Sequence, residues 1–136
     1  MRSFFSKQPS RILWEDCLGG LVVGLLVLFG REQICEWENL PLSIVVGMGA
    51  ANLLYGSFSL YVTLQQRRPR RLVEMLAVAN IAWLLVCLAI VLKHSSEMSL
   101  VGFVHVIGEG VYVAALGIME WSWRTELSQE SKQQTG

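Results

Sequence analysis

Four long stretches of the sequence are nearly free of charged side chains, and this feature limits the fold more than any other. At about 1.5 Å per residue, a helix over any of the last three stretches spans a hydrocarbon layer of about 30 Å. The first stretch is shorter and reaches this length only with help from residues 11–16. The stretches are Cys17–Gly30, Leu40–Leu64, Val73–Leu92 and Met98–Met119.

We therefore predict an all-α fold, in which a polytopic integral membrane protein forms a bundle of four transmembrane helices. A chain of 136 residues has room for one domain, and its content of 53% hydrophobic residues exceeds that of ordinary soluble domains. We place this domain at residues 1–126, with the acidic segment 31–39 as a loop and residues 127–136 as a disordered cytoplasmic tail. The helices are expected at about residues 11–30, 40–64, 70–92 and 96–123.

The positive charges are distributed unevenly over the connections between the spans. Nine of the eleven Lys and Arg residues lie before the first span, between the second and third, or after the fourth, whereas Arg31 and Lys93 lie on the other side. The positive-inside rule then places both termini in the cytoplasm. Because the chain is small and its loops are short, we expect it in the inner (plasma) membrane.

Polar side chains recur at the middle of three of the spans. His105, Glu109 and Tyr112 follow the spacing of four and then three residues that places side chains on one face of a helix. Asn52 with Tyr55, and Asn80 with Trp83, repeat the pattern of a polar residue followed three positions later by an aromatic one. Polar groups inside a membrane face the bundle interior, so we expect these groups to converge.

Glu109 is the side chain in this group with the strongest functional implication. A carboxyl in hydrocarbon favours its neutral form, and no Lys or Arg lies within the apolar cores. We expect Glu109 to be mostly neutral at pH 7 and to donate its proton to Asn52, Asn80 or His105. The candidate ligand- or proton-binding residues are Glu109, His105, Asn52, Asn80, Tyr55 and Tyr112.

The same side chains also have a purely structural interpretation. Asn, Glu and His pairs join transmembrane helices through hydrogen bonds of about 1 kcal/mol or less. Depth in the membrane does not separate such contacts from a working site. Tyr55 and Tyr112, likewise, are more often packing residues than parts of a ligand site.

The arrangement of four short helices with one membrane glutamate resembles the small multidrug-resistance exporters. In that family the essential glutamate lies in the first helix, whereas Glu109 lies in the fourth. The balanced charges that allow dual insertion are also missing here, so membership is not inferred.

Three functions follow as hypotheses. The first is a protein that binds or translocates a proton, cation or small solute, for which four helices suggest a homo-oligomer. The second is a non-catalytic accessory subunit of a larger membrane complex, with glycine faces that recognise other helices. The third is haem binding through His105, which would need a second protomer to supply another histidine.

Enzymatic activity and nucleic-acid binding are not expected. The sequence contains no metal-ligand cluster, nucleophile–base pair or phosphate loop. The formal net charge is zero, and the arginines of residues 65–71 are explained by topology. We therefore expect no cofactor, and we expect the lipid bilayer as the main partner.

Overall fold

The structure is a computed structural model that describes residues 9–133, with side chains up to residue 128. This part of the chain is all helical and contains no strand. The helices are α1 (Ser10–Phe29), α2 (Arg31–Glu38), α3 (Leu42–Leu64), α4 (Arg70–His94), α5 (Leu100–Ser122) and α6 (Arg124–Gln133).

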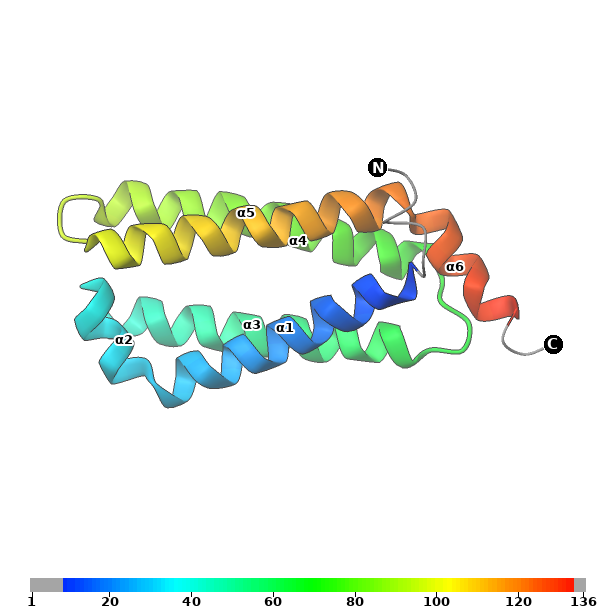
Figure 1. Cartoon of the computed structure of the whole chain (residues 1–136), viewed down its shortest axis with the longest axis horizontal. Coiled ribbons are helices and arrows are strands. Elements are labelled where there is room, and N and C mark those ends of the chain that lie inside the picture. The colour runs from blue at the N-terminus through cyan, green and yellow to red at the C-terminus, as the bar shows by residue number, and fades with distance from the viewer. Residues whose placement is uncertain (1–8, 134–136) are drawn as a thin grey trace.

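The four long helices form two hairpins that lie side by side (Figure 1). Helix α1 packs along α3, and α4 packs along α5, whereas contacts between the two pairs are far fewer. One end of the bundle, here called the α2 end, carries α2 and the loop 95–99 (Figure 1). The opposite end, here called the arginine end, carries the start of α1, the loop 65–69 and α6.

Four helices of the described chain are long and apolar enough to cross a membrane, as the sequence predicts, namely α1, α3, α4 and α5. Their outward surface is also apolar, since Leu26, Leu54, Leu85 and Val104 are each well exposed. Such a surface suits lipid rather than water. The architecture is therefore that of a multi-pass membrane protein.

Glycines allow the helices within each hairpin to approach closely. A Cβ atom added at Gly56 of α3 would lie 2.6 Å from the backbone nitrogen of Leu21 in α1. In the second hairpin, a Cβ at Gly117 of α5 would lie 2.7 Å from the carbonyl oxygen of Ala77 in α4. Close backbone approach through small residues is a common way to pack helices in membranes.

Residues 31–38 form a helix, α2, within the segment 31–39 that the sequence predicts to be a loop. Asn39 ends α2 in the left-handed conformation with φ 54°, which asparagine tolerates better than most residues. Residues Trp37 and Glu38 then contact the loop 95–99, since Ser99 donates its backbone N–H to the Glu38 carbonyl over 2.9 Å. Helix α2 therefore closes the bundle at its end.

The fourth long helix begins at Leu100 rather than near residue 96. Ser99 has an extended backbone, and its hydroxyl accepts a hydrogen bond of 3.1 Å from the Gly102 N–H. This side-chain cap satisfies a free N–H of the first turn and thereby sets the start of α5. The same hydroxyl donates to the Trp37 carbonyl over 2.6 Å, which joins the cap to α2.

The prediction of a disordered tail from residue 127 is wrong for residues 127–133, which belong to α6. Leu127 is fully buried in a cluster with four apolar residues, and this contact anchors α6 to the bundle. Arg124 also lies 3.4 Å from Glu74 of α4. The other members of the cluster are Leu13, Val62, Val73 and Leu76. Residues 134–136 lie outside the described part of the chain.

We predict opposite effects for two alanine substitutions in α3. Gly56→Ala introduces a Cβ against the α1 backbone and should lower stability by about 1–3 kcal/mol. Gly47→Ala places its Cβ in open space and should raise stability by up to about 1 kcal/mol, because alanine favours the helix. Thermal unfolding of the two variants in detergent measures the difference. Equal midpoints would contradict the close packing of α1 on α3.

Candidate functional site

A cavity of about 200 Å³ lies between the two hairpins and is lined by all four long helices. Two buried or nearly buried carboxyl groups face it, Asp16 from α1 and Glu109 from α5. None of the described residues that line the cavity is Lys, Arg or His. The cavity therefore favours a positively charged guest. The other polar and aromatic lining residues are Glu15, Asn52, Tyr55, Asn80, Trp83 and Tyr112.

Glu109 is held by donors from both hairpins. Its Oε1 atom accepts a hydrogen bond of 2.9 Å from Asn52 Nδ2 of α3 and another of 2.9 Å from Trp83 Nε1 of α4. The side chain is 10% exposed. The second oxygen, Oε2, is buried without a hydrogen bond in the described part of the chain.

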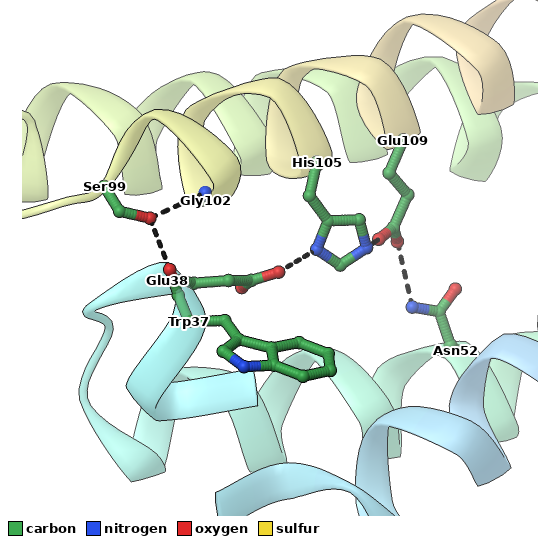
Figure 2. A network of polar contacts seen from close by, with 7 residues as sticks. All are labelled: Trp37, Glu38, Asn52, Ser99, Gly102, His105 and Glu109. Atoms are coloured by element: carbon green, nitrogen blue, oxygen red, sulfur yellow. Dashed lines mark hydrogen bonds and ion pairs between the residues drawn. The ribbon is translucent and has the colours of Figure 1, made fainter. Parts of the chain in front are cut away.

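His105 connects Glu109 to a second carboxyl, Glu38, at the α2 end (Figure 2). His105 Nε2 lies 3.6 Å from Glu109 Oε2, and His105 Nδ1 is hydrogen-bonded to Glu38 Oε1. Glu38 is 5% exposed, although α2 itself lies at the end of the bundle. The three side chains form a carboxyl–imidazole–carboxyl series that ends at the cavity.

Asp16 occupies an equivalent setting toward the arginine end of the cavity. Its Oδ2 atom accepts hydrogen bonds of 2.6 Å from the Tyr55 hydroxyl and 2.7 Å from the Ser59 hydroxyl, both on α3. Its Oδ1 atom accepts a bond of 3.1 Å from Asn80 Nδ2 of α4. The residue is 4% exposed. Asp16 is thus fixed by both hairpins, as Glu109 is.

The two carboxyl groups share one pattern of donors. Each accepts from an aromatic side chain of its own hairpin, and each accepts from an asparagine amide of the other hairpin. The donors come from two segments of equal spacing, Asn52 with Tyr55 on α3 and Asn80 with Trp83 on α4. Because α3 and α4 run in opposite directions, the asparagine of one segment lies level with the aromatic residue of the other. The cavity therefore has related carboxyl sites toward its two ends.

Glu120 adds a third acidic group beside Asp16. It is completely buried on α5, and its Oε2 atom accepts a hydrogen bond of 3.0 Å from Asn80 Nδ2. One amide nitrogen therefore donates to two carboxyl groups from different helices.

Five of the six residues selected from the sequence line the cavity, whereas His105 lies beside it against Glu109, and the six do not form one contact group. Asn52 and His105 approach Glu109, whereas Asn80 and Tyr55 bond to Asp16 instead. Of the three partners expected for the Glu109 proton, only His105 faces the free oxygen, because Asn52 donates to Glu109. Tyr112 lines the cavity and is 58% exposed.

Sequence reasoning did not select five residues that the structure brings into these contacts, namely Asp16, Glu38, Ser59, Trp83 and Glu120. Asp16 and Glu120 each lie one residue outside an apolar stretch, where the sequence gives no sign of burial. Trp83 follows Asn80 by three positions, as Tyr55 follows Asn52, and this repeat is the signal that could have selected it. Glu38 gave no signal, because the helix that carries it was expected to be a loop.

These contacts define what the site can do chemically. An imidazole between two carboxyl groups can accept a proton from one and release it to the other. The two buried carboxyl groups that face the cavity can exchange a bound proton for another cation, because either one neutralises the negative charge of a carboxylate. Comparisons with family models, curated proteins and solved structures found no match to this chain.

Proposed function

We propose that this protein binds and translocates a proton or another small cation through the cavity between its two hairpins. Glu109 is the group that carries the proton, and His105 is its exchange partner. The observation that supports this most is the series Glu38–His105–Glu109, which leads from the α2 end of the bundle to the cavity. A small solute that carries positive charge fits the same lining.

The remaining cavity groups extend this pathway toward the arginine end. Asp16 faces the cavity opposite the series, and Asn80 connects it to Glu120 near the end of α5. Protonatable groups thus lie on both sides of the cavity. A single chain supplies all of them, so the proposed pathway does not depend on a homo-oligomer.

We predict that Glu109→Gln abolishes proton-linked flux in liposomes. Glutamine keeps the shape and a carbonyl acceptor for Asn52 and Trp83, but it cannot take up or release a proton. The proton flux reported by a pH-sensitive dye, or the flux of a test cation, should fall by about 100-fold or more. This is the usual contribution of a positioned acid–base group.

The matched control for this experiment is Glu74→Gln. Glu74 pairs with Arg70 and Arg124 at the arginine end and lies away from the cavity lining. The Glu74→Gln protein should keep the wild-type rate of flux. A folded Glu109→Gln protein with undiminished flux would refute the proposed role of Glu109.

We further propose that the arginine end faces the cytoplasm of a cell with this protein in its inner (plasma) membrane, so that both termini are cytoplasmic. Arg11, Arg70, Arg71 and Arg124 lie at that end, together with the loop 65–69. Arg31 and Lys93 lie at the α2 end. This distribution supports the orientation by the positive-inside rule.

Cys35 provides a test of this orientation. It lies half-buried on α2, outside the four long helices, whereas Cys17 and Cys87 are fully buried. A membrane-impermeant maleimide should therefore label intact cells or right-side-out vesicles at Cys35 alone. Cys35→Ser should remove the signal. Labelling only from the cytoplasmic side would contradict the orientation.

The pH dependence of this labelling has a defined sign. Burial and the nearby Glu38 carboxylate raise the pKa of the Cys35 thiol above its ordinary value. Because the thiolate is the reactive form, the labelling rate should still be rising at pH 9, by about tenfold per pH unit below the pKa. A rate that levels off below pH 8 would contradict this environment for Cys35.

The same contacts bear on the two other functions. The glycines at the closest helix contacts, such as Gly56, pack α1 on α3 and α4 on α5 within the chain and are not free to recognise a partner helix, whereas Gly47 remains open. Both ring nitrogens of His105 face carboxyl groups, so iron ligation would require that Glu38 or Glu109 move away. An accessory role in a larger complex remains the alternative if liposomes show no flux.

A further inference from the structure

Asp16 and Glu120 form a pair of buried acids without a basic partner. They are 4% and 0% exposed, and no salt bridge joins either to a Lys, Arg or His in the described part of the chain. Buried carboxylates are stable only when protonated, paired with a base or bound to a metal ion. The pair therefore needs a proton or a cation from outside the chain.

Two buried oxygen atoms, one in this pair and one beside it, have no hydrogen-bond partner among the described residues. They are Asn80 Oδ1 and Glu120 Oε1, and their residues are 1% and 0% exposed. Nearly all buried polar atoms in proteins have a partner, so an unpartnered one calls for a water or an ion. Here two such atoms belong to residues that are already in contact with each other.

The geometry around Asn80 matches the oxygen spacing of a metal site. Its Nδ2 atom lies 3.1 Å from Asp16 Oδ1 and 3.0 Å from Glu120 Oε2. The two ends of an amide have nearly the same size and shape, so a half-turn places Oδ1 where Nδ2 now lies. The Asn80 oxygen would then lie about 3 Å from one oxygen of each carboxylate. Oxygens this close repel one another without a cation, but the spacing suits neighbouring ligands at about 2.0–2.6 Å from Mg²⁺ or Ca²⁺.

The surroundings supply the other parts of such a site. Tyr55 and Ser59 donate to Asp16 Oδ2, and these bonds orient the carboxylate and leave Oδ1 for a cation. Asp16 and Asn80 both line the cavity, which offers an entry path and room for water ligands. The described chain has no group of three or more His, Cys, Asp or Glu residues that could hold a metal ion. In this site the third ligand is an amide.

We propose that Asp16, Asn80 and Glu120 bind a hard divalent cation, of the class of Ca²⁺ and Mg²⁺. The donors are all oxygen, as such ions prefer. Two carboxylates carry the charge that one divalent ion neutralises, whereas a monovalent ion leaves one buried charge uncompensated. This site is separate from the Glu109 centre and goes beyond the proposed function.

Equilibrium binding of Ca²⁺ and Mg²⁺ to the purified full chain in detergent tests the site. We expect saturable binding of one ion per chain by at least one of the two metals. Asp16→Asn and Glu120→Gln should each abolish it, while Ser59→Ala should weaken it by about tenfold or more, because it loosens Asp16. Glu74→Gln, which changes a carboxyl away from the cavity, should bind the metal as the wild type does.

Two further measurements keep the result decisive. Thermal unfolding shows whether each variant folds, and infrared difference spectra of the wild-type chain with ¹³C-labelled aspartate report metal-induced shifts of the Asp16 carboxylate. Absence of saturable binding, binding of Na⁺ alone, or binding that survives both acid substitutions would overturn the proposal. Loss of flux in Glu109→Gln with normal metal binding would leave both proposals standing, and metal binding without any flux would refute the transport function alone.

Discussion

Two hydrogen bonds across the interior connect the halves of this molecule. Asn52 of α3 donates to Glu109 of α5, and Asn80 of α4 donates to Asp16 of α1. Lipid tails are as apolar as a leucine side chain, so burial of apolar surface cannot drive the association of helices within a membrane. Within each hairpin, close backbone packing at glycines supplies the contact. Between the long helices of the two hairpins, where contacts are few, the amide-to-carboxyl bonds join the halves in the interior, and the contacts of α2 with α5 join them at the α2 end.

This arrangement explains why the cavity lies where it does. Apolar clusters fill the bundle toward each end, one around Val45, Val91 and Val106 and the other around Leu13, Val73 and Leu127. The space between them is bordered by the two bridged carboxyl groups and by small residues such as Gly19 and Ala79. The polar groups that join the hairpins are thus the same groups that face the cavity. Their structural and functional interpretations do not exclude each other.

Much of the fold could be predicted from the sequence, because long apolar stretches have few alternatives to a spanning helix. Helix α2 could not, since eight mostly polar residues carry no membrane signal and depend on Ser99 for their contacts. The folding of the tail depends on one residue, Leu127, whose burial requires a pocket built from three other helices. A single apolar residue in a polar segment does not predict such a pocket.

The site was predictable only in part, for a related reason. Hydropathy gives the level of a residue along its helix, and the matching levels of Asn52 and Glu109 correctly indicated a contact. It does not give rotation about the helix axis, so it could not tell that Asn80 turns toward Asp16 and Glu120. It also assigned both acids to the ends of their helices, where exposure to water would be expected. Their burial follows from the tertiary packing of α1 and α5 against the opposite hairpin.

The contact between the two hairpins can be measured directly in a bilayer by solid-state NMR. With ¹³C-labelled glutamate and ¹⁵N-labelled asparagine, the side-chain carboxyl carbon of Glu109 should show a dipolar coupling to Asn52 Nδ2, as expected for a hydrogen bond of 2.9 Å from that nitrogen to Oε1. The coupling should vanish in Asn52→Leu and persist in Asn80→Leu. A wild-type chain that folds in the bilayer without this coupling would contradict the convergence of the two hairpins on a common cavity.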